Sequence, residues 1–154
     1  MEVEYRLITA LDDVTSVDIV LLGEMAHGES SYCHLGFVPE KLLGIAARFA
    51  SGDDSFFVMA YEGNKPVGVF VGDIDEYYFS HDMVATDFVW YVVPERRGSR
   101  IGIQLLDLFE GWALEKGASD VRIGQSTNIT PEVFEGLLKK RGYKFIGTNY
   151  RMGT

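Results

Sequence analysis

The sequence predicts a single α/β (α+β) domain. We expect a mixed central sheet with antiparallel N-terminal strands and a parallel strand–helix–strand crossover, flanked by about four helices. Three observations support this. The 154 residues suit one domain, 47% of them are hydrophobic, which excludes a disordered chain, and strand and helix patterns alternate without an internal repeat or linker.

The N-terminal part predicts one strand and two helices. A short strand is expected over residues 5–9, and a helix from residue 39 to about residue 50 follows a loop. Between this strand and this helix, apolar residues recur at three- and four-residue spacing, which is typical of a further, amphipathic helix. The residues of this stripe are Leu11, Val14, Val17, Leu21 and Met25. We expect the stripe to face the core.

The middle of the chain predicts three consecutive strands. Residues 56–61 and 67–72 are joined by a short polar turn with glycine and proline, which is typical of a hairpin. A longer strand is expected from about Met83 to Val93. Strands that follow one another through short turns pair antiparallel.

The C-terminal part predicts the crossover and two further elements. A helix with an apolar stripe is expected over residues 101–117, followed by a strand that contains Val121 and Ile123. This order should place the two flanking strands parallel. A helix over residues 131–141 and a final strand over residues 143–152 complete the expected fold.

Composition indicates the compartment and the class of partner. A single cysteine, Cys33, cannot form an internal disulfide, which indicates a reducing compartment such as the cytoplasm. The first residues are acidic, unlike a secretory signal, and no apolar run reaches the roughly 18 residues of a membrane span. The net charge of -9 argues against nucleic-acid binding. We therefore expect a cytoplasmic protein with neither a nucleic-acid nor a membrane partner.

The charge is unevenly distributed along the chain. Residues 1–93 contain 16 acidic and 4 basic side chains, whereas residues 94–154 contain 7 acidic and 10 basic ones. Such asymmetry is typical either of two ligands of opposite charge or of an uneven solvated surface.

The most informative segment is the basic, glycine-containing turn that joins the strand ending near Val93 to the next helix. The first turn of a helix has unpaired N–H groups, so it can bind a phosphate. Gly98 and Gly102 permit close approach, and three arginines add positive charge. The segment can therefore be a diphosphate cradle or an ordinary turn. Neither a P-loop nor a Rossmann glycine motif is present.

This turn resembles the pyrophosphate signature of the GNAT superfamily of acetyl-CoA-dependent N-acetyltransferases. The signature is Gln or Arg, two variable residues, Gly, a variable residue, and Gly or Ala. It falls here on Arg97, Gly98, Ser99, Arg100, Ile101 and Gly102. The first and last positions match, but Arg100 replaces the middle glycine. The late helix and the order of elements are also similar, so the resemblance implies one N-acetyltransferase-like domain over residues 1–154.

The resemblance implies a reaction and a set of cofactor contacts. An amine would attack the thioester of acetyl-CoA directly, without a metal. Residues 97–102, which we call the glycine–arginine turn, would bind the pyrophosphate. Backbone N–H groups of Val92 and Val93 would polarise the thioester carbonyl, and Asn128 would contact the cofactor. The resemblance allows a homodimer as well as a monomer.

Asp87 is the candidate catalytic base or amine-orienting acid, because it lies in an otherwise apolar strand. In regular alternation it would share a face with Val89 and Tyr91, although a bulge would change that register. A structural or solvated role is the alternative. The family often has a tyrosine as general acid where this chain has Leu138, so the general acid is unassigned.

The acidic half of the chain predicts a positively charged acceptor, such as a polyamine, an aminoglycoside or a lysine-like amine. His27, Glu29, Cys33 and His34 share one loop, but they lack the paired spacing of a zinc site. We interpret that loop as substrate-facing or as ordinary surface. The alternative function is a non-catalytic acyl-CoA-binding sensor, or an acidic protein-binding module, on the same fold.

Overall fold

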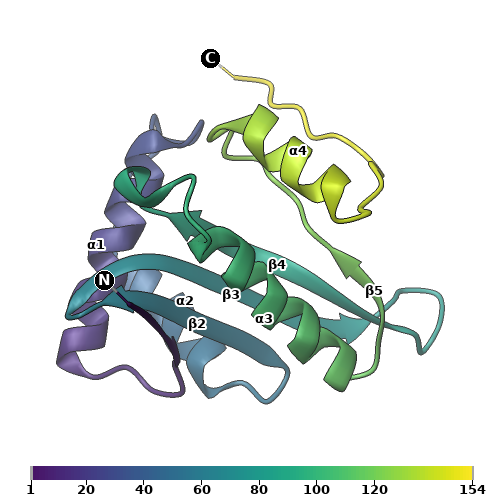
Figure 1. Ribbon diagram of the computed structural model, residues 1–154, viewed down its shortest axis with the longest axis horizontal. Helices are drawn as coiled ribbons and strands as arrows, with labels where there is room; N and C mark the ends of the chain where they lie inside the picture. Colours follow the sequence, from purple (N-terminus) through teal and green to yellow (C-terminus); the bar gives the residue numbers. More distant parts are fainter. Residues whose placement is uncertain (1, 154) are drawn as a thin grey trace.

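The computed structural model describes residues 2–153, which form one five-stranded sheet with helices on both faces (Figure 1). In chain order the elements are β1 (Val3–Leu7), α1 (Asp13–Glu29), α2 (Pro39–Ser51), β2 (Ser55–Glu62), β3 (Lys65–Glu76), β4 (Met83–Val92), the 3-10 turn η1 (Pro94–Arg96), α3 (Ile101–Glu115), β5 (Ala118–Arg122) and α4 (Pro131–Lys140).

The sheet has the strand order β1-β2-β3-β4-β5. Strands β1 to β4 pair antiparallel, and β5 pairs parallel with β4 after the crossover through α3. The predicted mixed sheet is therefore confirmed. β1 begins two residues before the expected position, and β5 ends at Arg122, so Ile123 lies beyond it.

Helix α3 covers one face of the sheet, and α1 and α2 cover the other (Figure 1). Ile101, Leu105 and Phe109 of α3 are buried, which confirms the predicted stripe of this helix. The ring of Phe109 stacks on that of Phe70 in β3, with 4.5 Å between the ring centroids. The crossover helix is thus fixed to the centre of the sheet by aromatic packing.

Helix α1 does not bury the predicted stripe. Val14 and Val17 are 70% and 67% exposed, whereas Ile19 is buried on another face together with Asp18. The helix has apolar residues on several sides, so spacing alone did not identify its buried face. Asp18 is tolerated inside because the Tyr61 hydroxyl donates a hydrogen bond of 2.8 Å to it.

Gly23 does not interrupt α1, which continues to Glu29. A Cβ atom at Gly23 would collide with the side chain of Leu42 in α2. The glycine is therefore explained by the close approach of two packed helices rather than by a helix end.

The predicted final strand over residues 143–152 is wrong, because no regular secondary structure follows α4 in the described residues. The segment is held near both of its ends by other elements. The Tyr143 hydroxyl donates to Glu110 of α3 at 2.6 Å, and Arg151 donates to the carbonyl of Ser31 at 2.6 Å. These contacts lead the chain past α4 and towards the α1–α2 loop (Figure 1).

Within residues 2–153, no helix combines the length and the hydrophobicity that crossing a membrane requires.

Candidate active site

A bulge in β4 divides the strand into two parts. Val71 of β3 is opposite Val89, but the next residue, Gly72, is opposite Asp87, so Phe88 is the additional residue. The pairing of β4 with β5 ends just before the bulge, at Thr86. Within residues 2–153, the second part of β4 therefore has β3 on one edge and no strand on the other.

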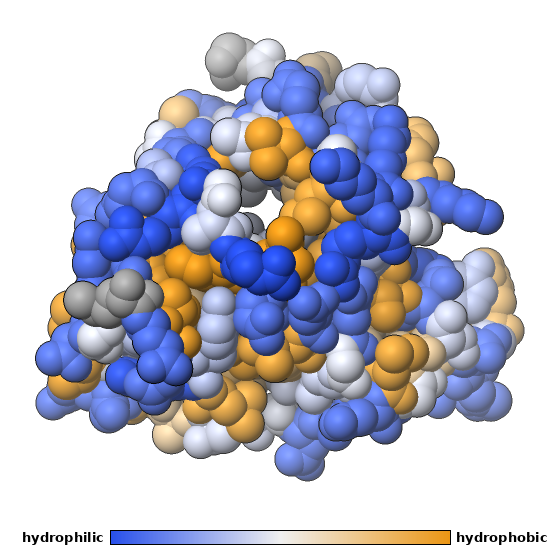
Figure 2. Space-filling view, viewed as in Figure 1, coloured by the Kyte–Doolittle hydropathy of each residue, from blue (hydrophilic) through white to orange (hydrophobic). Residues whose placement is uncertain are grey.

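The space beside that unpaired edge is the β4–β5 gap, between residues 87–92 of β4 and residues 123–129 of the following chain. Figure 2 shows an opening in this region, between the start of α3 and the chain that leads into α4, with hydrophobic residues on part of its rim and polar ones on the rest. An elongated ligand could lie here against exposed backbone groups of β4.

The two valines at the end of β4 direct their N–H groups to opposite edges. The N–H of Val93 donates to the carbonyl of Val67 at 3.0 Å, on the side of β3. Because successive N–H groups of a strand alternate, that of Val92 is directed towards the gap. Val92 therefore retains a backbone donor for a ligand, whereas the donor of Val93 is used within the sheet.

The glycine–arginine turn fits a phosphate group. The first helical bond of α3 runs from the Gln104 N–H to the Arg100 carbonyl, so the N–H groups of Gly102 and Ile103 have no acceptor within residues 2–153. Gly98 has a φ of +85°, a conformation that favours glycine. Arg100 has a φ of -84°, so the replacement of the signature glycine there carries no backbone strain.

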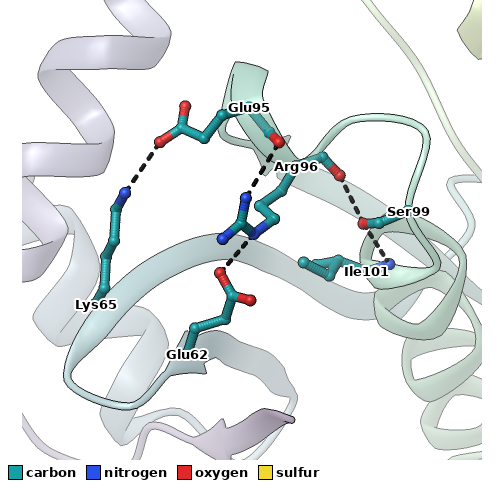
Figure 3. Close-up of polar contacts among 6 residues, drawn as sticks. All are labelled: Glu62, Lys65, Glu95, Arg96, Ser99 and Ile101. Carbon is teal, nitrogen blue, oxygen red and sulfur yellow. Dashed lines mark hydrogen bonds and ion pairs between the residues drawn. The ribbon is translucent and has the colours of Figure 1, made fainter. Parts of the chain in front are cut away.

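The β2–β3 hairpin holds the turn from one side (Figure 3). Arg96 Nε donates to Glu62 Oε1 at 2.5 Å, and Lys65 Nζ donates to Glu95 at 3.2 Å. The Ser99 hydroxyl donates to the Arg96 carbonyl at 2.6 Å and accepts the first N–H of α3 at 3.3 Å. The backbone of the turn is thus fixed before any ligand binds.

Helix α1 holds the turn from the other side. Arg97 donates two hydrogen bonds of 2.8 Å to the carboxylate of Glu29, the last residue of α1. Its Nε donates to the Val92 carbonyl at 3.0 Å, and the Tyr91 hydroxyl donates to Glu29. The Arg97 guanidinium lowers the pKa of Glu29 below its ordinary value. The carboxylate is therefore ionised at neutral pH.

The α1–α2 loop reaches across to the far side of the gap. The Ser31 N–H donates to the Thr127 carbonyl at 2.7 Å, and the Ser31 hydroxyl donates to the Ser126 carbonyl at 2.8 Å. The adjacent Asn128 is exposed and has a φ of +60°. This loop and residues 126–128 together close one end of the gap.

Asp87 lies on the α3 face of the sheet, so regular alternation with Val89 and Tyr91 does not hold and the alternative that the sequence left open, a bulge, applies. Asp87 is paired with Gly72 of β3, so both residues face the same side of the sheet. A Cβ atom added at Gly72 would lie 2.6 Å from the Phe109 ring of α3, which identifies that side. The bulge causes this reversal. The Asp87 carboxylate accepts the Gly124 N–H at 2.9 Å across the gap.

The environment of Asp87 suits proton transfer. Burial raises its pKa to about 6, and the hydrogen bond from Gly124 opposes this effect only in part. A carboxyl group with this pKa is largely ionised at neutral pH and binds a proton more readily than an ordinary aspartate.

Comparison with known proteins establishes the family of the chain. A profile of the acetyltransferase (GNAT) family matches residues 27–129. The chain belongs to this family. No curated protein sequence matches the chain.

Solved structures that share its fold include two acetyltransferases and a transcriptional regulator. The aminoglycoside N-acetyltransferase AAC(6')-Iy, in complex with the bisubstrate analogue CoA-S-monomethyl-acetylneamine, has a TM-score of 0.75 at 14% identity, with all of both chains covered. Glucosamine-6-phosphate N-acetyltransferase from Arabidopsis thaliana has a TM-score of 0.72 at 16% identity, with 99% of this chain and 100% of that chain covered. A transcriptional regulator from Bacillus halodurans C-125 has a TM-score of 0.78 at 16% identity over the same shares.

Two tyrosine hydroxyls near the β4–β5 gap already donate to carboxylates. Tyr143 donates to Glu110 and Tyr91 donates to Glu29, and burial raises the pKa of both phenols. Leu138, at the position where the family often has a tyrosine, is buried. These contacts assign no general acid.

The polar side chains of the α1–α2 region make contacts within the protein. Within residues 2–153, no group of three or more His, Cys, Asp and Glu side chains is placed to hold a metal ion. His27 instead contacts the Leu35 carbonyl through Nε2 at 2.8 Å, and its ring lies 5.6 Å from that of Phe37. In the sequence, Glu29 is not distinguished from the other acidic residues near this loop. In the structure, its ion pair with Arg97 joins α1 to the glycine–arginine turn.

Proposed function

We propose that this GNAT protein transfers an acetyl group from acetyl-CoA to a primary amine. The observation that carries the proposal is the continuous arrangement of the bulged β4, its unpaired edge and the glycine–arginine turn. One path thereby offers a backbone donor for a thioester carbonyl and a cradle for a pyrophosphate.

The turn and the gap would hold the two parts of the cofactor. The N–H groups of Gly102 and Ile103 would bind the pyrophosphate, and Ser99 and Ile101 keep the turn in place. The pantetheine arm would lie along the unpaired edge of β4, with Asn128 on the opposite wall. There is free space beside Gly102 for this ligand. If a Cβ atom were added at Gly102, its nearest neighbour would be Val92 Cγ2 at 3.6 Å, an ordinary contact distance.

Acetyl-CoA, when bound, supplies the acetyl group, which passes from the thioester sulfur to the amine nitrogen. The Val92 N–H would donate to the carbonyl oxygen as negative charge develops on it. Asp87, with a pKa of about 6, would accept the proton that the amine loses, directly or through water. The leaving thiolate would take its proton from solvent.

The acceptor would be a cationic amine. Acidic residues lie at the end of β3 and before β4, at the opposite end of β4 from the basic turn: Asp73, Asp75, Glu76 and Asp82. Burial and the neighbouring Asp75 raise the pKa of Asp73, which indicates a crowded negative region. The negative potential would attract a polyamine, an aminoglycoside or a lysine-like amine. The similarity to an aminoglycoside acetyltransferase fold is compatible with this class.

The test is thiol release from acetyl-CoA with a panel of amines. We expect turnover with cationic amines, and kcat/KM for them should fall as salt shortens the Debye length from roughly 30 to 10 Å. A preference for acidic acceptors, or kinetics indifferent to salt, would contradict the cationic acceptor. Tight binding of acetyl-CoA without turnover of any amine would favour the alternative, a non-catalytic sensor.

A further inference from the structure

We propose that the outer edge of β1 binds the same edge of a second copy of this chain, so that two sheets join into one. The two copies of β1 run antiparallel about a twofold axis at Tyr5. Two strands separate β1 from β4, so this interface is distinct from the β4–β5 gap and does not depend on the proposed acetyl transfer.

Strand β1, the dark strand beside the N-terminus in Figure 1, forms one edge of the sheet. It pairs with β2 on its inner side, and within residues 2–153 no strand pairs with its outer side. The Ile8 N–H donates to the Phe57 carbonyl of β2 at 2.9 Å. Because backbone groups alternate between the two edges of an antiparallel strand, those of Val3, Tyr5 and Leu7 are directed outwards.

This edge carries none of the features that usually prevent strand pairing. Natural proteins protect exposed edges with proline, lysine or a bulge. The sequence of β1, Val-Glu-Tyr-Arg-Leu, contains neither proline nor lysine, and the strand pairs with β2 in an unbroken register. An unprotected edge of this kind is a template for another strand.

The charged side chains of β1 lie on the α1 face of the sheet. The Arg6 guanidinium carbon lies 4.2 Å from the ring centroid of Tyr61, whose hydroxyl bonds to Asp18 of α1. Arg6 and Glu4 form an ion pair of 3.0 Å within the strand, and their side chains are 40% and 65% exposed. One base and one acid therefore lie two residues apart, on either side of Tyr5, with room for further partners.

A twofold axis at Tyr5 makes these charges complementary. Glu4 of each copy is then directly opposite Arg6 of the other, and opposite charges in such cross-strand pairs stabilise a sheet. The outward backbone groups also allow an axis at Glu4 or at Arg6, but each of these places two like charges opposite each other. Like charges in that position are destabilising. The charges thus select the register centred on Tyr5.

The other face of the same joint is apolar. In this register Val3 of each copy is opposite Leu7 of the other, and the two Tyr5 side chains are neighbours. Leu7 is 66% exposed in the single chain, so pairing would remove apolar surface from water. The edge is therefore complementary to itself in backbone direction, charge and hydrophobicity, which identifies a second copy as the partner.

The test is the mass of the protein in solution, measured by sedimentation equilibrium up to about 100 μM. We expect the wild type to form a dimer. Glu4→Arg and Arg6→Glu should each raise the Kd of the dimer about tenfold or more, because like charges then meet at two places. An equimolar mixture of the two variants should recover the dimer, since each chain supplies the charges that the other lacks.

Leu7→Pro tests the backbone of the joint and remains informative if a charge variant fails to fold. The Leu7 N–H is directed outwards, so proline removes a hydrogen bond of the joint and none with β2. We expect weaker dimerisation with the Tm of the isolated chain unchanged.

Arg122→Glu is the matched control at the opposite edge of the sheet. Arg122 of β5 also pairs with an acid two residues away, Asp120, so this variant makes the same charge change outside the proposed joint. It should remain dimeric. The inference is overturned by a wild type that is monomeric at about 100 μM, by a dimer that survives Leu7→Pro, or by a mixture of the two charge variants that stays monomeric.

Discussion

The two walls of the β4–β5 gap are built differently. On the β4 side, the glycine–arginine turn is joined to the hairpin through Glu62 and to α1 through Glu29, above a core in which Phe70 and Phe109 are fully buried. The opposite wall is a chain without regular structure between β5 and α4. The wall that would receive the pyrophosphate is thus fixed by the fold, whereas the other wall depends on a few local contacts.

Those contacts lie at the two ends of α4, the helix that follows the second wall. Near α4, Arg141 donates to Asp107 and Glu110 of α3, and Tyr143 donates to Glu110. At the other end, Ser31 bonds to the carbonyl groups of the chain before Asn128. We infer that changes in the β4 wall affect cofactor binding directly, and that changes in the second wall affect mainly stability.

The largest expected effect on the affinity for CoA is that of Gly102→Val in the β4 wall. An added Cβ has room within the protein, so the variant should fold, but the side chain would occupy the approach to the unpaired N–H groups. The Kd of CoA should rise about 10- to 100-fold, as measured by calorimetry. Gly111→Val in the same helix is the control, because no atom lies within 4 Å of a Cβ built there. Unchanged affinity in a folded Gly102→Val variant would contradict the cradle.

Asp87→Asn should affect turnover rather than binding. The asparagine oxygen can still accept the Gly124 N–H, so the gap should keep its shape, but the side chain cannot accept a proton. We expect kcat to fall about 100-fold, the lower end for general base catalysis, with little change in the Kd of CoA. Equal turnover of the two proteins would remove Asp87 from the mechanism. Loss of activity in Asp87→Ala alone would assign it a positioning role.

The pH profile provides an independent measure of the same residue. Because burial raises the pKa of Asp87 to about 6, kcat/KM should fall as the pH drops through 6 and the base becomes protonated. The folded protein also holds this proton more tightly than the unfolded chain, whose aspartate has a pKa near 3.9. Asp87 should therefore stabilise the fold at low pH and lose this contribution as the pH rises from about 4 to 6. Asp87→Asn should abolish both dependences, and a profile that is unaltered in this variant would refute the assignment.

The smallest effect on the cofactor is expected from Arg141→Met, at the C-terminal end of the helix that follows the second wall. Loss of the contacts with Asp107 and Glu110 should lower the free energy of unfolding by about 1–3 kcal/mol. The Kd of CoA should change less than twofold, because the β4 wall does not depend on these contacts. Lys140→Met, at an exposed position, is the control for denaturation experiments. A large loss of CoA affinity in Arg141→Met would show that the two walls are not independent.

The sequence predicted the parts of the molecule that depend on local pattern. Turn chemistry located the hairpin, and the order of elements located the crossover. The phosphate cradle around Gly98 and Gly102, which the sequence left open against an ordinary turn, stays a prediction. The sequence did not predict the face of Asp87, because a bulge depends on register against a neighbouring strand. Nor did it predict the pair of Glu29 and Arg97, which are 68 residues apart and meet only in the folded chain.

Two expectations about secondary structure, the buried face of α1 and the final strand, are wrong for related reasons. The stripe of α1 was assigned to the core, but this helix has apolar residues on several sides, and its packing against α2 through Gly23 decides which side is buried. The strand propensity of residues 143–152 did not produce a strand, because side-chain contacts of Tyr143 and Arg151 lead the segment elsewhere. The homodimer and the cytoplasmic location remain predictions.

The central claim is that CoA lies along the unpaired edge of β4 with its pyrophosphate on the glycine–arginine turn. An NMR titration of the 15N-labelled protein with CoA tests this most directly. The account predicts that the largest amide shifts occur at Val92, Gly98, Gly102 and Ile103, with small shifts at the acidic end of the sheet near Asp75. Saturable shifts confined to other regions, with these four amides unchanged, would contradict it.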